Sequence, residues 1–248
     1  MGLPGPGSAR QKWGGCMSEA ERVDSMSFFS RLVNMFIAPG KVFEFLMQKP
    51  LWVVPLSVVT LAITLQQGII MSSQTGKEGM RQEIQKSPRA AQLSPEQVDQ
   101  QISMMGKIIP VSTFIVAPVI TFAAAGLIYL IFSIVLGGEI TYKQTLSAWT
   151  HVGFIGLVGI AVQTALVFIK GTIRPNTSLA AFLPFLEEDS FIYHFLQTFD
   201  LFVLWQLAVL SLGMGMLSRV GTKKAAITIF STLVVIGLII AGVRQAFS

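Results

Sequence analysis

Five long apolar runs constrain the fold of this chain more than any other feature. They cover roughly residues 51–71, 108–136, 151–169, 200–217 and 225–243. A helix that crosses a bilayer needs about 20 predominantly apolar residues, and each run comes close to that length or exceeds it. Only 12% of the residues are charged, about half of the share in soluble domains. The sequence therefore predicts an all-α polytopic membrane bundle of about five transmembrane helices, within residues 51–248.

Two amphipathic interfacial helices are expected ahead of the first run, over residues 26–50. Between residues 26 and 37, apolar side chains recur at helical spacing, which is typical of a helix that lies in the membrane interface. These side chains are Phe28, Phe29, Leu32, Val33 and Phe36. Pro39 suits the first turn of a second helix. The apolar face of that second helix comprises Val42, Phe43 and Leu46.

The first 25 residues are expected to form a disordered tail, or an over-extended start with Met17 or Met26 as the true initiator. This segment holds Cys16, the one cysteine of the chain. A single cysteine excludes an intramolecular disulfide and a cysteine-based metal site. We expect neither a metal nor a cofactor.

The connections between the runs contain recognisable helix signals. Trp52 is expected to anchor the first span in the interface. Residues 72–107 are polar, and Ser94 to Gln97 form a capping box with Pro95 in the first turn. We expect a hairpin that packs on the membrane surface there, with Val98, Ile102 and Met105 on one face. Pro110 and Pro118 predict a kink or tilt in the second span. A short interfacial helix, capped by Asp189 or Ser190, is expected before the fourth span.

The basic residues lie between the apolar runs, where they indicate topology rather than binding to nucleic acid. Arg219, Lys223 and Lys224 stand together between the last two runs, and Lys41 and Lys49 flank the first. Because short cytoplasmic loops are enriched in Lys and Arg, we expect a cytoplasmic N-terminus and an outer C-terminus in a bacterial inner membrane. The lipid bilayer is the expected partner, together with protein partners or further copies of the chain.

Chemistry-bearing residues are sparse. Asp, Glu, Lys and Arg are missing from the depth of the five runs, which argues against a proton-driven pump. Motifs of hydrolases, nucleotide-binding loops and paired-histidine metal sites are missing too. His151 is compatible with a proton relay or a headgroup contact, but an interfacial histidine with a wet edge is the favoured interpretation. His194 is expected on the surface. We therefore expect a protein without enzymatic activity.

Uncharged polar residues within the runs are interpreted mainly as bridges between helices. They are Gln66, Gln67, Thr121, Ser133, Gln163, Thr164, Gln206 and Ser211. Gln206 is the best candidate for lining a pocket, because it lies near Asp200. Asp200 opens the fourth run, where a carboxylate can cap free backbone N–H groups. The alternative is that Asp200 and Gln206 line a cleft that faces lipid headgroups. Gly153, Gly156 and Gly159 predict close helix packing.

Three segments together resemble the bacterial type of the Yip-domain family. "FIAPGKVFEFLMQKPLWVVPL" contains Pro39 and Trp52, "GGEITYKQTLSAWTHVGFI" precedes the third span, and "DLFVLWQLAVLSLGMGMLSRVGTKKA" is similar to the Asp, Trp, Gly and Lys-Ala pattern of the family. The residues that match this last pattern are Asp200, Trp205, Lys223 and Lys224. The resemblance covers roughly residues 30–245. It implies a five-span bundle with a cytoplasmic N-terminus, from a family whose eukaryotic members act in vesicle traffic with Rab-type GTPases.

Three functions remain open from the sequence. The leading hypothesis is a membrane organiser or trafficking-type scaffold that acts on lipid or partner proteins. The second is a transporter or permease subunit, with Gln163 or Gln206 lining a path. The third is a lipid-modifying enzyme that uses Asp200 and His194.

Overall fold

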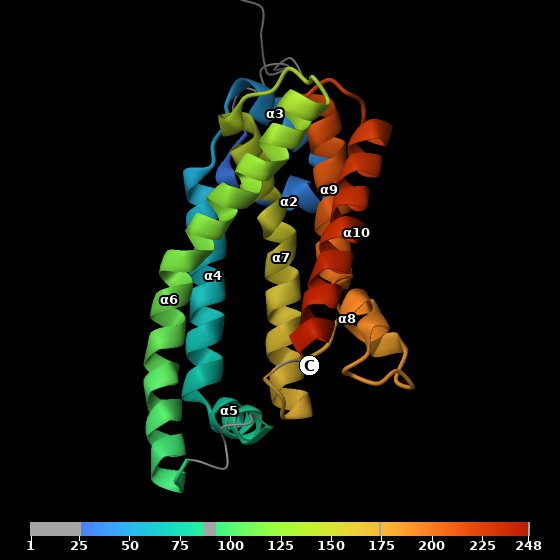
Figure 1. Ribbon diagram of the computed structural model, residues 1–248. Coiled ribbons are helices and arrows are strands. Elements are labelled where there is room, and N and C mark those ends of the chain that lie inside the picture. The colour runs from blue at the N-terminus through green and yellow to red at the C-terminus, as the bar shows by residue number, and fades with distance from the viewer. Residues whose placement is uncertain (1–25, 87–92, 174, 248) are drawn as a thin grey trace, which may run out of the picture.

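The computed structural model describes residues 26–86, 93–173 and 175–247, and this part of the chain is a bundle of α-helices (Figure 1). Its β-structure is limited to one isolated bridge between Ser178 and Asp200. The longer apolar helices are α4 (Val53–Ser72), α6 (Pro95–Leu130), α7 (Tyr142–Lys170), α9 (Leu201–Leu217) and α10 (Thr222–Phe247). The shorter elements are α2 (Phe28–Ile37), α3 (Pro39–Gln48), α5 (Gln74–Lys86), η2 (Ile131–Val135), η3 (Leu179–Phe182) and α8 (Phe191–Gln197). The expected tail at residues 1–25 lies outside the described residues.

Among the residues that the structure describes, four helices are long and apolar enough to cross a membrane: α4, α6 together with η2, α7 and α10. The fifth expected span corresponds to α9, which has 17 residues. At about 1.5 Å per residue it is about 25 Å long, somewhat less than the roughly 30 Å of a hydrocarbon core. The all-α membrane bundle is confirmed, and the crossing by α9 stays a prediction.

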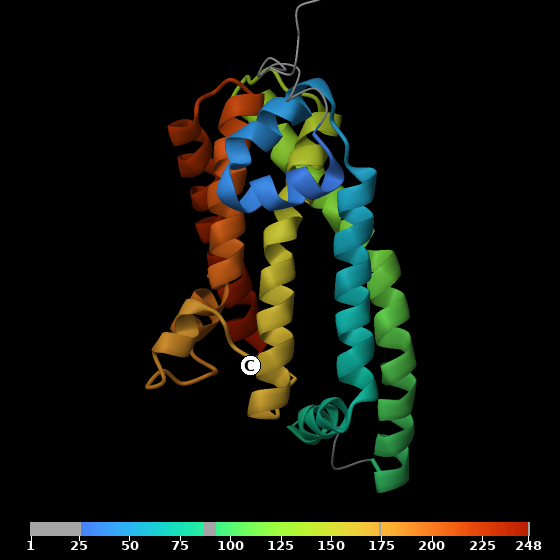
Figure 2. The ribbon, with the colours of Figure 1, turned by 180° about the vertical axis from the view of Figure 1, so that it is seen from behind.

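The helices follow one another in space much as they do in sequence. Helix α4 packs against α6 and α7, α7 packs against α9, and α9 packs against α10. Seen from behind, α2 and α3 lie across α7 and α9 at one end of the bundle (Figure 2). Helix α5 lies at the opposite end, and α8 packs on α10 in that half of the molecule. Helix α2 and the C-terminal end of α10 lie toward opposite ends of the bundle (Figure 1).

Two helices begin earlier than their apolar runs indicate. Helix α6 starts at Pro95, behind a capping box of Ser94 and Gln97. The second arm of the surface hairpin expected within residues 72–107 is therefore the first part of α6, and the face with Ile102 packs in a small core. Helix α7 starts behind a second capping box, of Thr141 and Gln144. In both cases a strong cap adds polar turns that hydropathy alone assigns to a loop.

Helix α6 is bent, as its two internal prolines predict (Figure 1). It continues into η2, a turn of π-helix that ends near Gly137, which has a positive φ. The bend carries the upper part of α6 across α7. Tyr142 at the start of α7 donates a hydrogen bond to the carbonyl oxygen of Phe122 in α6, at 3.0 Å.

The larger hydrophobic core lies at the end that carries α2 and α3. Val42, Phe43 and Leu46 of α3 have no exposed surface, so the predicted apolar face of this helix packs into protein. Phe43 contacts α9 at Gly213, where a Cβ atom would lie 2.3 Å from the ring. The missing side chain thus makes room for the ring. The smaller core, at the opposite end, joins α5 to the bundle through Met80, Met71 and Ile102.

Candidate functional site

Helix α2 presents two different faces. Its outer face carries Phe29, Val33 and Ile37, which are 75%, 49% and 77% exposed. Phe28, Leu32 and Phe36 pack against the core instead. The structure therefore divides the single apolar face predicted for residues 26–37 into a packed side and an open side. We call Phe29, Val33 and Ile37 the outer stripe.

The inner face of α2 carries a charged side chain. Arg31 is only 5% exposed, and its guanidinium lies over the ring of Phe45, 5.2 Å from the ring centroid. Its Nε atom is buried without a hydrogen-bond partner. Burial lowers the pKa of the Arg31 guanidinium from its ordinary value. An apolar stripe outside and a cation inside is the inverse of a soluble amphipathic helix.

His151 of α7 lies on the inner side of α2 as well. Its ring Nδ1 lies 2.8 Å from the carbonyl oxygen of Ser147, and its Nε2 is buried without a partner. The ring is fully buried and packs edge-on against Phe154, which also contacts Phe28. The expected wet interfacial histidine is therefore wrong. Helices α2 and α3 cover this stretch of α7. The hydropathy of a single span cannot predict that other helices cover it.

Asp200 caps α9. Its Oδ1 accepts hydrogen bonds from the backbone N–H groups of Phe202 and Val203, at 2.8 and 3.1 Å. Its Oδ2 accepts a hydrogen bond from the hydroxyl of Thr177. Gln163 in turn donates to Thr177 at 3.4 Å. The carboxylate thus fixes both the start of α9 and the loop that precedes η3, which is the capping arrangement expected from the sequence.

The remaining predicted residues are spread over the bundle. Gln206 packs against α7 at Gly156. A Cβ atom added to Gly156 would lie 3.0 Å from the amide nitrogen of Gln206. Trp205, on the same helix, meets the ring of Phe36 of α2 edge-on. Trp52 precedes α4 and stacks edge-on against Phe122. Pro39 stands in the first turn of α3. Asp200 and Gln206 form no hydrogen bond with each other, since Asp200 caps α9 and the Gln206 amide packs at Gly156.

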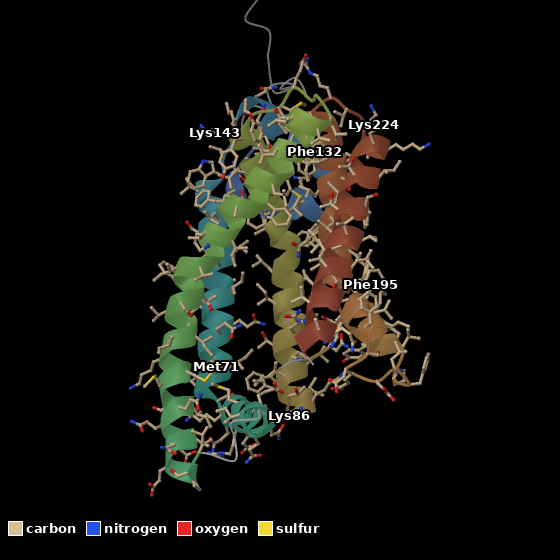
Figure 3. The ribbon with its side chains drawn as sticks, viewed as in Figure 1. Met71, Lys86, Phe132, Lys143, Phe195 and Lys224 are labelled. Carbon is tan, nitrogen blue, oxygen red and sulfur yellow. The ribbon has the colours of Figure 1, made fainter. Side chains whose placement is uncertain are left out.

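Charge differs between the two ends of the bundle. We call the end with α2 and α3 the basic end. Lys143 and Lys224 lie there, whereas Lys86 lies at the opposite end (Figure 3). The described charges of the basic end are Arg31, Lys41, Lys49, Lys143, Arg219, Lys223 and Lys224, with Glu44 and Glu139. Those of the opposite half are Lys77, Arg81, Lys86, Lys107, Lys170 and Arg244, with Glu78, Glu83, Glu96, Asp99, Glu187, Glu188, Asp189 and Asp200. Cations dominate the first set and carboxylates the second.

A cleft of about 220 Å³ opens between α6 and α10. Trp149 of α7 and Val203, Leu207 and Leu210 of α9 also line it. Its lining is almost wholly apolar, because Thr232 directs its hydroxyl to the backbone of its own helix. Such a lining suits hydrocarbon rather than a polar solute.

The residues of the enzyme hypothesis do not form a catalytic arrangement in the described part of the chain. His194 is half-buried rather than on the surface, and its Nδ1 has no hydrogen-bond partner. Asp200 uses both oxygens for the cap and for Thr177. Within residues 26–86, 93–173 and 175–247, no cluster of three or more His, Cys, Asp or Glu could hold a metal ion.

Sequence reasoning missed Arg31. A signal was available, because Phe28, Arg31, Leu32 and Met35 follow the i, i+3, i+4, i+7 spacing of one helix face. A cation within such a stripe indicates either a buried charge or a misassigned face.

Comparison with known proteins agrees with this architecture. The family model of the Yip1 domain matches residues 33–243. A Bacillus subtilis (strain 168) protein named "Membrane protein YknW" is 28% identical over 212 residues, covering 84% of this chain and 88% of that protein. No solved structure matches the chain significantly. The match to the Yip1 domain extends over most of the chain and includes α3 and every long helix, so this integral membrane protein belongs to the Yip1 domain family.

Proposed function

We propose that this protein is a non-enzymatic organiser of the bacterial inner membrane, which acts on lipid and on partner proteins. The observation that carries the proposal is the outer stripe of α2 at the basic end of the bundle. Apolar side chains that protrude next to cations are suited to anionic lipid, because the chains enter the hydrocarbon while the cations meet the headgroups.

The orientation proposed for the protein follows from the same end. Cytoplasmic segments are enriched in Lys and Arg, and the basic end carries the excess of cations. The N-terminal helices would then face the cytoplasm and the C-terminus would lie outside. The outer stripe would enter the inner leaflet, whose anionic lipids attract juxtamembrane cations.

The runner-up function is a transporter or permease subunit. The cleft between α6 and α10 supports it for an apolar cargo, since the lining is hydrocarbon-like. Gln206 and Gln163, the candidates for a polar path, instead contact Gly156 and Thr177. Flux of an apolar solute in proteoliposomes would favour this function over the organiser.

The organiser is tested with protein reconstituted into vesicles of phosphatidylglycerol and phosphatidylcholine. We compare the wild type with a Phe29→Ser, Ile37→Ser double variant. The readouts are the immobilised fraction of spin-labelled phosphatidylglycerol and the vesicle diameter. We expect the double variant to lose most of the effect on both readouts and still to resist carbonate extraction.

The matched control is Phe182→Ser with Phe185→Ser, because these rings are similarly exposed, at 66% and 76%, in the opposite half of the bundle. In the leaflet that the basic end faces, this control is expected to give the same lipid response as the wild type. An unchanged lipid response in the Phe29 and Ile37 variant would overturn the organiser.

The orientation is tested by cysteine labelling in a Cys16→Ser background. Lys224→Cys marks the basic end and Lys86→Cys the opposite end, and both positions are exposed. A membrane-impermeant maleimide added to spheroplasts should label residue 86 alone. Labelling of residue 224 alone would reverse the proposed topology.

A further inference from the structure

The buried pair of Arg31 and His151 lacks the counter-groups that such side chains need. Arg31 is an ion in a protein interior, and an uncompensated buried ion costs several kcal/mol. In the part of the chain that the structure describes, no carboxylate lies within ion-pair distance of Arg31. The Phe45 ring gives it a cation–π contact, which offsets part of the cost of burying the charge. That contact leaves Nε–H without an acceptor.

His151 presents the opposite deficiency. Its Nδ1 donates to the Ser147 carbonyl oxygen, since a carbonyl can only accept. In the neutral ring the other nitrogen, Nε2, is then an acceptor, and it has no donor. Phe154 contacts both the His151 ring and Phe28, which lies on the same face of α2 as Arg31, so the two unpartnered groups belong to one contact region between α2 and α7. Together they offer one cationic donor and one neutral acceptor, both enclosed by α2, α3 and α7.

We propose that Arg31 and His151 form a binding site for a phosphate group that also carries a hydroxyl hydrogen. The anionic oxygen of the ligand accepts from the Arg31 guanidinium, and the hydroxyl donates to Nε2 of His151. Hydrogen phosphate and the headgroup of phosphatidylglycerol both have this combination, whereas phosphatidylcholine has the phosphate without the hydroxyl. No bond is made or broken.

Helix α2 lies over this site, so a lipid headgroup would reach it where α2 moves away from α7. The outer stripe of α2 is exposed, while its inner face covers α7. The helix joins α3 at Ala38, whose backbone angles, φ −146° and ψ 63°, are not helical. The site goes beyond the proposed function, since it holds one headgroup in the protein interior and does not require an effect on the bilayer.

The test uses the full chain in detergent and titration calorimetry with three probes. These are inorganic phosphate, dihexanoyl phosphatidylglycerol and dihexanoyl phosphatidylcholine. We expect phosphatidylglycerol to bind more tightly than phosphatidylcholine. Arg31→Gln should weaken binding at least about tenfold, as loss of a charged hydrogen bond implies. His151→Phe should remove the preference for phosphatidylglycerol over phosphatidylcholine.

Arg219→Gln is the matched control, because it removes an equal charge from the exposed surface of the same end. Its affinity should change less than about twofold, as expected for an exposed rim charge. Arg31→Met guards against a mere folding defect. Replacing a buried ion by an apolar side chain is often neutral or stabilising, so this variant should melt no lower than the ligand-free wild type and gain nothing from the ligand.

The probes separate two sources of the phosphate. Binding of both inorganic phosphate and phosphatidylglycerol, each dependent on Arg31, identifies a general phosphate site, and binding of phosphatidylglycerol alone identifies a lipid site. The proposal is overturned if no probe binds, or if Arg31→Gln and Arg219→Gln bind equally well. It is also overturned if phosphate binds only after Glu19, Glu21 and Asp24 are changed to Gln, Gln and Asn, since the chain's own carboxylates would then occupy the site. Retained binding in the Phe29 and Ile37 variant would separate this site from the organiser.

Discussion

The two ends of the bundle attach their peripheral helices in different ways. At the basic end, α3 inserts Val42, Phe43 and Leu46 into the main core until none is exposed. At the opposite end, α5 is polar and joins the bundle through a small separate cluster around Met80. Helix α3 is held by the main core and can therefore keep Phe45 in contact with the charged side chain of Arg31. Helix α5 is held by a small cluster and serves as a cover for its end of the bundle. Arg31 of α2 and His151 of α7, which bury polar atoms without hydrogen-bond partners, both lie at the end that holds the main core.

The largest expected effect tests this contrast in packing. Phe43→Ala removes a fully buried ring from the main core, and we expect it to lower the free energy of unfolding by about 3–5 kcal/mol. Met80→Ala, in the small cluster, should cost about 2–3 kcal/mol, near the lower limit for such changes. Steric trapping in bicelles measures both. Equal losses would show that the two ends are held equally firmly.

Overpacking gives the second test at the basic end. Gly213→Ala places a methyl group where the Phe43 ring lies, 2.3 Å away. The ring is enclosed and must shift, so we expect a loss of about 1–3 kcal/mol. Gly68→Ala is the control, because nothing lies within 4 Å of its added Cβ. A Gly213→Ala variant as stable as this control would mean that α3 is free to move away from α9.

The caps allow a comparison between two helix starts in the opposite half. Asp200→Ala removes two backbone hydrogen bonds and the contact with Thr177, and we expect a cost of about 1–2 kcal/mol. Ser94→Ala breaks the capping box of α6, where the exposed terminus is hydrated more easily. Its cost should be about 0.5–1 kcal/mol. If Asp200→Asn, which keeps an acceptor oxygen, is as damaging as Asp200→Ala, the negative charge matters more than the cap.

Local signals in the sequence predicted these helix starts well, and they predicted burial poorly. Ser94 and Asp200 were identifiable because a cap depends on residues two or three positions apart. The apolar face of α3 was likewise predictable from its spacing. The burial of His151 was not, because it depends on α2 and α3 lying across α7, more than a hundred residues away in the chain. Arg31 lies on the same helix face as apolar residues of α2, and the sequence of α2 alone does not show which residues of other helices pack against that face.

A bridge between helices provides a smaller effect. Gln66 of α4 donates to the Ile160 carbonyl oxygen and to Thr164 of α7, at 3.1 and 3.0 Å. Such hydrogen bonds contribute roughly 0.6 kcal/mol on average in membranes. A double-mutant cycle of Gln66→Leu with Thr164→Val should give a coupling energy of about that size. A coupling near zero would assign the stability of the α4–α7 contact to packing alone.

The smallest effect concerns two exposed ion pairs from opposite ends of the bundle. Arg219 and Glu139 lie 2.6 Å apart with side chains 77% and 74% exposed, and Arg81 pairs with Asp99 at the opposite end. Exposed pairs contribute about 0–1 kcal/mol because water and salt screen them. We therefore expect Arg219→Gln and Arg81→Gln to change the unfolding free energy by less than about 0.5 kcal/mol each. A larger, salt-sensitive loss from Arg219→Gln alone would mean that the connection between α6 and α7, which carries Glu139, depends on this pair. The firm attachment of the basic end would then be partly electrostatic, not a consequence of the main core alone.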